Sequence, residues 1–142
     1  MEYRFIIRAQ EYQSALANLI ELSKRDLSKL DKVIYNAVIS GILSQFNILY
    51  DLAYKTMKDI LIEYHGVTDF AKGSPREIFE SAYSVNLIHD DKWQHMRVDR
   101  NSIQHSYEEL PKLEEFKDKI FAQYIPLFQA FARKIEKIKE NN

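Results

Sequence analysis

Apolar side chains recur along most of this chain at alternating spacings of three and four, the period of an α-helix with one buried face. The first such stretch covers about residues 2–25, and its apolar stripe is Phe5, Ala9, Tyr12, Leu16 and Leu19. The second covers about residues 30–65 and is the longest, with the stripe Tyr35, Ile39, Ile42, Phe46, Leu49, Ala53, Met57, Ile60 and Tyr64. Both stretches predict helices that pack in a bundle.

Local signals indicate where the second helix begins, where it ends and where it meets a neighbour. Ser28 and Asp31 are the two candidate N-terminal caps, because their side-chain oxygens can accept the first free amides of a helix. Gly66 suits the left-handed turn that ends many helices. Gly41 lies inside the helix, where glycine costs about 1 kcal/mol relative to alanine. We expect it to permit a close helix–helix approach, with a mild kink as the alternative.

A shorter helix follows a strong start signal. The run S-P-R-E, beginning at Ser74, places a capping serine, a proline at the first helical position and a glutamate that can reach back to the cap. This helix should reach about residue 86, with inward positions Ile78, Ala82 and Val85. Asp90 or Asp91 then caps a further helix over about residues 91–104, whose apolar positions are Trp93, Met96 and Ile103.

The last predicted helix begins near residues 108–111, where acidic side chains suit the positive end of a helix. Its apolar stripe is Leu113, Phe116, Ile120, Tyr124, Leu127, Phe131, Ile135 and Ile138. Pro126 lacks an amide hydrogen and crowds the preceding turn, so it should kink this helix. The final residues have the composition of a solvated tail that frays.

The chain length and the scarcity of turn residues narrow the fold class. With 142 residues, the chain should form a single domain over residues 1–142. Three glycines and three prolines are too few for the many turns of an all-β protein. We therefore predict an all-α protein, an antiparallel up-and-down four-helix bundle with a short extra helix.

Composition also narrows the class of function. The formal net charge is −1, so the charge of the whole chain does not favour binding to nucleic acid. The chain has no cysteine, which excludes disulfides and cysteine catalysis and fits a reducing compartment. The N-terminal run M-E-Y-R-F-I-I-R carries charges within its apolar residues, unlike a signal peptide, and no apolar run approaches the length of a membrane span. We expect a cytoplasmic protein with no membrane partner.

The run D-R-N-S-I-Q-H-S-Y, from Asp99 to Tyr107, concentrates polar chemistry where the fourth helical pattern ends. Arg100 lies four residues after Met96 and three before Ile103, so it fills an apolar position of that stripe. An unpaired buried charge is very costly. Arg100 must therefore meet a carboxylate, line a polar groove or extend to the surface.

Arg100 and His105 together suffice for one metal-free reaction, the cleavage of a phosphodiester by an adjacent ribose 2′-hydroxyl. Arginine can neutralise a phosphate through forked hydrogen bonds, and histidine can move a proton near neutral pH. On a continuous helix the two side chains would point about 140° apart, so they converge only if the helix ends between them or a second subunit completes the site. Spacing alone favours the other interpretation, a salt-bridged structural arginine and an ordinary surface histidine.

Other catalytic patterns are missing from the sequence. No set of His, Asp and Glu has the spacing of a metal site, and there is neither a phosphate-binding glycine loop nor a G-x-S-x-G motif. We therefore expect no metal and no cofactor. The aromatic stripes are most simply core, and paired acids such as Glu114 and Glu115 a solvated face.

Three segments carry a family resemblance: Q-F-N-I-L-Y-D-L-A-Y-K-T-M-K (Gln45–Lys58), S-P-R-E-I-F-E-S-A-Y (Ser74–Tyr83) and W-Q-H-M-R-V-D-R-N-S-I-Q-H-S-Y-E-E (Trp93–Glu109). In this order they resemble the HEPN superfamily, and within it the nucleotidyltransferase substrate-binding proteins. The last segment contains the signature R-x4-H-x-Y. The first departs from the pattern: Asn47 stands for a glutamate, Asp51 is shorter than the usual acid and Tyr54 replaces a tryptophan. A role for a full-length acid on this helix is therefore not carried over.

The resemblance to toxin-like members implies a metal-independent endoribonuclease, the toxin of a toxin–antitoxin pair. Arg100 and His105 would then be the catalytic pair, with Asp99 and Asn101 as supporting polar residues. Tyr107 would be the residue that a partner adenylylates to silence the toxin.

The same resemblance implies a homodimer that binds a minimal nucleotidyltransferase encoded nearby, with RNA or a nucleotide as ligand. The branch name implies an alternative function, a non-catalytic nucleotide- or substrate-binding subunit of the transferase complex. The near-neutral charge favours this alternative, because a free RNA-cutting protein more often carries a basic face. Whether the chain is an enzyme therefore remains open at this point.

Overall fold

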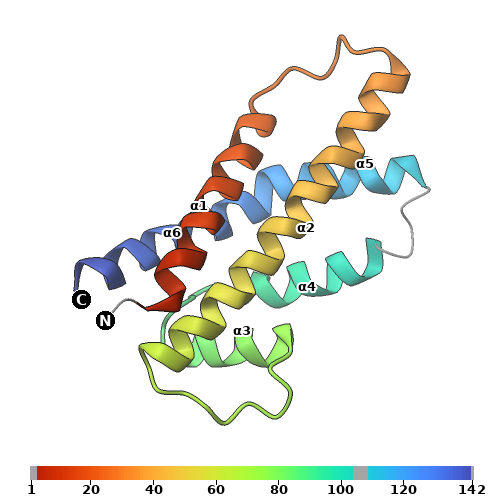
Figure 1. Cartoon of the computed structure of the whole chain (residues 1–142). Helices are drawn as coiled ribbons and strands as arrows, with labels where there is room; N and C mark the ends of the chain where they lie inside the picture. Colours follow the sequence, from red (N-terminus) through yellow and green to blue (C-terminus); the bar gives the residue numbers. More distant parts are fainter. Residues whose placement is uncertain (1–2, 104–108, 142) are drawn as a thin grey trace.

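The computed structural model of the chain describes residues 3–103 and 109–141. Its elements are α1 (Arg4–Ser23), α2 (Lys32–Glu63), α3 (Pro75–Ser84), α4 (Lys92–Ile103), α5 (Leu110–Lys119), the π-helical segment η1 (Ile120–Tyr124) and α6 (Ile125–Glu140). Every element within the two described ranges is helical, which confirms the all-α fold class. The segments α5, η1 and α6 follow one another without a break and form one long, gently bent rod (Figure 1).

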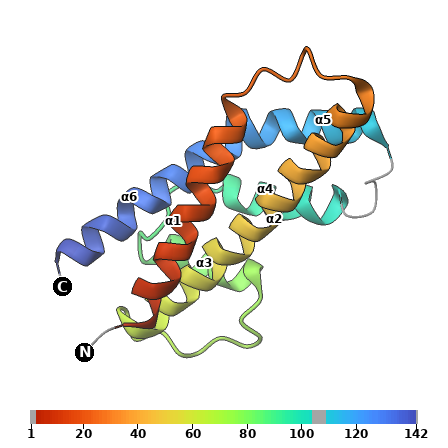
Figure 2. The same ribbon diagram turned by 45° about the horizontal axis from the view of Figure 1, so that its top comes forward.

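The helices pack around a hairpin. α1 and α2 lie side by side as this hairpin in both views, and the α5–α6 rod crosses it at an angle (Figures 1 and 2). α6 contacts α1, whereas α5 contacts α2. α3 packs against α2 and α4, and α4 packs against α5. This arrangement brings the last turn of α4 beside the middle of α2.

The apolar stripes that the spacing predicts form the core. All predicted inward positions of α1 and of the α5–α6 rod are buried. Aromatic rings fill the centre, where Phe46 lies 5.2 Å from Phe116 and Trp93 lies 5.5 Å from Phe128 between ring centroids. The Tyr12 hydroxyl donates to the Phe128 carbonyl at 2.6 Å and joins α1 to α6. Two members of the predicted α2 stripe are not buried. Tyr64 is 40% exposed, because α2 has already ended at Glu63. Tyr35 is half-buried, and its hydroxyl donates to the Glu114 carboxylate at 2.6 Å.

Helix termini follow the local signals closely. The Asp31 carboxylate accepts from the Ile34 amide at 3.0 Å, so Asp31 rather than Ser28 caps α2. Gly66 adopts a φ of 71°, the left-handed conformation predicted for the residue that ends this helix. The Asp90 carboxylate accepts from the Lys92 amide at 2.9 Å at the start of α4.

The start of α3 extends the predicted capping box. The Ser74 hydroxyl oxygen accepts from the Glu77 amide at 3.4 Å, as predicted. The Glu77 carboxylate reaches back beyond the cap and accepts from the amides of Ala71 and Lys72 at 2.9 and 3.0 Å. The same side chain therefore also holds the loop that precedes α3.

Pro126 is accommodated within the rod. The wider π-helical turns of η1 come directly before it. Proline removes an amide hydrogen and crowds the carbonyl four residues earlier, and a wider turn relieves that crowding. The helix therefore bends gently and continues to Glu140, and Ile138 packs into the core, so the last turns are part of the fold rather than a frayed tail.

α2 also has an outward apolar face. Its members share exposure and alternating spacings of three and four, and we call them the α2 outer stripe: Ile34, Ala37, Gly41, Ser44 and Ile48. A Cβ on Gly41 would meet nothing within 4 Å, so within this chain the expected close approach at Gly41 is wrong.

α2 is long and apolar enough to cross a membrane by length and composition alone, which corrects our expectation that no run is. In the fold its inward face packs against α1, α3 and α5.

Candidate functional site

Arg100 lies in the last turn of α4 and points at α2. Its Nε donates to the Asn47 Oδ1 at 3.2 Å, and its Nη2 lies 3.6 Å from the Asp51 Oδ1. Its Cζ lies 4.6 Å from the centre of the Tyr50 ring, a cation–π contact. The Arg100 side chain is 19% exposed. These contacts explain why a guanidinium occupies an apolar position of the stripe. We call the three contacting residues of α2, Asn47, Tyr50 and Asp51, the Arg100 seat.

Arg100 retains hydrogen-bonding capacity in this seat. A guanidinium has five N–H donors in a planar fork, and Asn47 engages one of them. The Asp51 contact is long for a charge-assisted bond, and the Asp51 side chain is 46% exposed. A phosphate could therefore bind the outer edge of Arg100 while its contacts with Asn47 and Tyr50 stay in place.

Tyr50 forms the floor beneath Arg100. It is 1% exposed, and its hydroxyl has no hydrogen-bond partner among the described residues. Burial raises the pKa of Tyr50 to about 12, although the positive charges of Arg100 and Arg97 lower it. The phenol therefore stays neutral near physiological pH, with a proton available for a hydrogen bond.

Asp99 faces another part of the fold. Its Oδ2 lies 3.2 Å from the Lys119 Nζ and accepts the hydroxyl of Tyr124. Burial, the hydrogen bond to Asp99 and the charge of Asp99 together raise the pKa of Tyr124. Asp99 thus ties α4 to α5 and η1, whereas Arg100 ties α4 to α2. A supporting role of Asp99 toward Arg100 would act through the position of α4.

The other predicted site residues are Asn101, His105 and Tyr107. Asn101 is exposed at the end of α4, and its side chain forms no hydrogen bond to the residues that the structure describes. His105 and Tyr107 lie outside the described residues. Their catalytic and modification roles therefore stay predictions.

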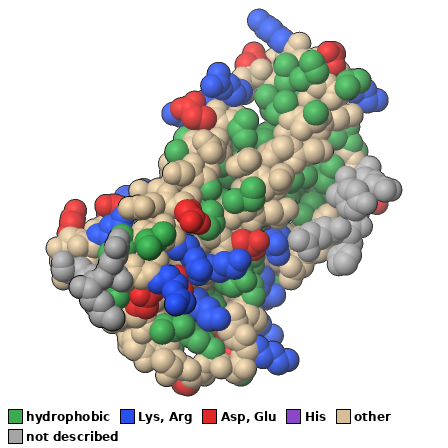
Figure 3. All heavy atoms as spheres, viewed as in Figure 1, with side chains coloured by type: hydrophobic (Ala, Val, Ile, Leu, Met, Phe, Trp, Pro, Cys, Tyr) green, Lys and Arg blue, Asp and Glu red, His purple; other side chains and the backbone are tan. Residues whose placement is uncertain are grey.

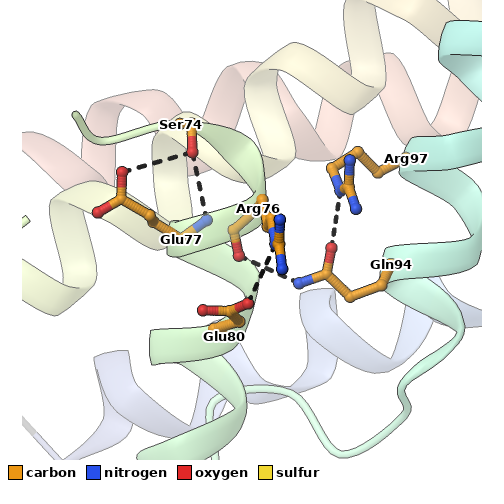
Figure 4. A network of polar contacts seen from close by, with 6 residues as sticks. All are labelled: Ser74, Arg76, Glu77, Glu80, Gln94 and Arg97. Carbon is orange, nitrogen blue, oxygen red and sulfur yellow. Dashed lines mark hydrogen bonds and ion pairs between the residues drawn. The ribbon is translucent and has the colours of Figure 1, made fainter. Parts of the chain in front are cut away.

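A polar network on the adjoining turn of α4 was missed by the sequence reasoning. The Gln94 Nε2 donates to the Arg76 carbonyl on α3 at 3.1 Å, and the Gln94 Oε1 accepts from the Arg97 Nε at 2.8 Å (Figure 4). Arg76 also pairs with Glu80 at 3.4 Å. Gln94 therefore links α3 to Arg97. The available signal was the spacing, since Arg97 precedes Arg100 by three residues and shares its face of the helix.

A second Arg–Asp pair lies elsewhere on α2. Lys and Arg side chains gather over the neighbouring ends of α1 and α2 (Figure 3). There the Arg8 Nη1 lies 3.0 Å from the Asp59 Oδ2. The Nη1 donates to the Lys55 carbonyl at 3.4 Å, and the Asp59 Oδ2 has no hydrogen bond among the described residues, so the Arg8 contact is an ion pair only. Burial raises the pKa of Asp59 above its ordinary value of 3.8, against the positive charge of Arg8.

The arrangement around Arg100 suits the binding of an anion. It joins a guanidinium with free donors to an aromatic floor and a neutral buried hydroxyl. Within residues 3–103 and 109–141, no group of three His, Asp or Glu side chains is placed to hold a metal ion. The planar fork of an arginine matches the geometry of a phosphate or a carboxylate.

Comparison with known proteins identifies the family of the chain. No curated protein matches the chain. The family model described as "Nucleotidyltransferase substrate binding protein like" matches residues 7–137, nearly the whole length, and includes α4 with Arg100. The chain therefore belongs to the family of nucleotidyltransferase substrate binding protein-like proteins.

Proposed function

We propose that this chain is the substrate-binding partner of a minimal nucleotidyltransferase, and that Arg100 contacts a phosphate of the bound nucleotide or RNA. The single observation that carries this is the seat of Arg100, which orients the guanidinium and leaves part of its fork unused. Asn47 and Tyr50 hold the side chain in one conformation, so less rotamer entropy is lost when a phosphate binds. The family membership supports the association with a transferase.

Complex formation is tested first. The chain, expressed with the nucleotidyltransferase encoded by the neighbouring gene, should co-purify with it at micromolar concentration. A chain that elutes alone contradicts the proposal. In the complex, Arg100→Met should weaken binding of labelled ATP, whereas the matched change Arg133→Met, at an exposed arginine of α6, should not.

A second candidate function is metal-independent cleavage of RNA. The half-buried guanidinium favours it, because such a group can stabilise the charge of a pentacovalent phosphorane. His105 would take the proton of the ribose 2′-hydroxyl and return one to the leaving oxygen. Total RNA incubated with the purified protein should be cut, and a His105→Ala variant should cut it much more slowly. Equal cleavage by both proteins, or none by either, excludes this function.

Modification of Tyr107 by the partner is a separate part of the proposal. Adenylylation would add a bulky anion seven residues beyond Arg100 in the chain and could silence the site through charge. Co-expression with the transferase and ATP should add one AMP mass to the peptide that holds Tyr107. A Tyr107→Phe protein that gains the same mass in that peptide would refute the assignment.

We also propose that two copies of the chain pair through the α2 outer stripe. Ile34 and Ile48 are 50% and 46% exposed, and the small residues between them would let a second helix approach closely. Asp51 lies one turn beyond Ile48, so the second copy would border the Arg100 site. Gly41→Lys should convert a dimer to a folded monomer in sedimentation analysis, whereas Ser14→Lys on exposed α1 should not. An unchanged dimer with Gly41→Lys places the interface elsewhere.

A further inference from the structure

Arg97 is held toward the same side of α4 as Arg100. Residues three apart on a helix have Cβ atoms about 5–6 Å from one another. The Arg97 Nε donates to the Gln94 Oε1 at 2.8 Å, and Gln94 is itself anchored on the Arg76 carbonyl at 3.1 Å (Figure 4). The conformation of Arg97 is therefore fixed from α3, just as that of Arg100 is fixed from α2.

Among the described residues Arg97 has no carboxylate partner, whereas the Arg100 Nη2 lies 3.6 Å from the Asp51 Oδ1. Arg97 is nevertheless half-buried. A half-buried cation without a counter-ion is an arrangement that a bound anion would complete.

We propose that Arg97 is a second phosphate-binding residue, and that it and Arg100 contact two consecutive phosphates of a single-stranded RNA. Arg97 binds one phosphate through its Nη atoms, since its Nε is engaged by Gln94. Arg100 binds the next phosphate through its outer edge, on the side away from Asn47. This inference rests on the proposed function, because it names the kind of substrate that the Arg100 site accepts.

The spacing of the two cations distinguishes RNA from a free nucleotide. Residues three apart on a helix have Cβ atoms about 5–6 Å from one another, a separation closer to that of successive phosphates along a strand than to that of the directly bonded phosphates of a triphosphate. Binding should therefore be stronger for a ten-nucleotide oligouridylate than for UTP or pyrophosphate. The salt dependence of binding should count both contacts, because each phosphate contact to a single strand adds about 0.7 to the slope of log affinity against log salt concentration.

The experiment measures the fluorescence anisotropy of labelled ten-nucleotide oligouridylate from 50 to 300 mM NaCl. Arg97→Gln should weaken binding roughly tenfold and reduce the slope by about 0.7. Arg97→Lys should restore the slope but only part of the affinity, because the charge returns without the fork. Arg133→Gln, at an exposed arginine of α6, is the matched control and should change neither by as much. Circular dichroism of each variant checks the fold.

Four outcomes overturn the inference. Three of them concern the comparison of variants and ligands: Arg97→Gln behaves as Arg133→Gln does, Arg97→Lys fails to restore the slope in a folded protein, or UTP competes with the oligonucleotide at equal concentration. Wild-type protein that does not bind the oligonucleotide also overturns it. Each result leaves the proposed function intact as long as the chain still co-purifies with its transferase and Arg100→Met still weakens ATP binding.

Discussion

Two Arg–Asp pairs connect α2 to its neighbours, and they are built in opposite ways. In the Arg8–Asp59 pair the acid is the buried member, with side-chain exposures of 31% for Arg8 and 8% for Asp59. In the Arg100–Asp51 pair the arginine is the buried member, at 19%, and Asp51 is 46% exposed. The first pair is also closer, at 3.0 Å against 3.6 Å. The two Arg–Asp pairs therefore differ in which partner is buried.

The difference indicates which pair is structural and which can take a ligand. A buried carboxylate depends on its cation, because removing the cation leaves an uncompensated charge in a poorly solvated place. Asp59 is a buried carboxylate of this kind, and Arg8 is its cation. Asp51 is solvated and needs no partner, whereas Arg100 rests on Asn47 and the Tyr50 ring. A ligand anion can approach Arg100 from solvent without leaving any buried charge unpaired.

The largest expected effect is on stability, from Arg8→Met. This change keeps most of the apolar stem but removes the cation beside Asp59, and it should lower the free energy of unfolding by roughly 2–4 kcal/mol. Urea denaturation measures it. Adding Asp59→Asn to the Arg8→Met protein should recover part of the loss, since a neutral amide costs less to bury. A loss below about 0.5 kcal/mol would show that the Arg8–Asp59 pair is no more structural than an exposed one.

The next effect is the pH dependence that Asp59 adds to stability. Its pKa is raised in the folded state above the ordinary 3.8, so near that pH the folded chain binds more protons than the unfolded chain. Its contribution to the free energy of unfolding therefore falls as the pH rises from 3.8 through the raised value. The difference between wild type and Asp59→Asn in urea denaturation at a series of pH values isolates this contribution. A difference that is flat, or that rises with pH, contradicts the raised pKa.

Arg100→Met should change stability little and weaken ligand binding, the opposite of what we expect from Arg8→Met. Because Asp51 remains solvated, the free energy of unfolding should change by less than about 1 kcal/mol in either direction. Binding of ATP by the transferase complex should nevertheless be weakened, whereas Arg8→Met should leave it unchanged where the protein is folded. If both variants lose stability equally, the contrast between the two pairs is wrong.

The smallest expected effect comes from Tyr50→Phe, which keeps the ring under Arg100 and removes the hydroxyl. A buried hydroxyl without a partner is unfavourable, so the free energy of unfolding should stay the same or rise by up to about 1 kcal/mol. Thermal denaturation measures the change. A clear loss of stability would mean that the hydroxyl has a partner in the folded chain.

The sequence by itself determined the helices, most of their ends and the unusual position of Arg100. These features depend on interactions within a few residues: the period of 3.6, the oxygen of Asp31 on nearby amides and the left-handed turn at Gly66. The family resemblance had the same basis, in segments that keep their order along the chain, and the family match over residues 7–137 confirms it.

Only the tertiary structure decided what Arg100 touches. Asn47 lies 53 residues from Arg100 in the chain, and the two meet because α4, packed against α3 and α5, brings its last turn beside the middle of α2. The rotation of α4 about its axis turns Asp99 toward Lys119 and Tyr124, and the rotation of α2 leaves Gly41 facing outward. Periodicity tells which residues share a face of one helix, but contacts between helices depend on the crossing and rotation of both. The packing of the whole core sets that geometry, so the partners of Arg100 could not be derived from local spacing.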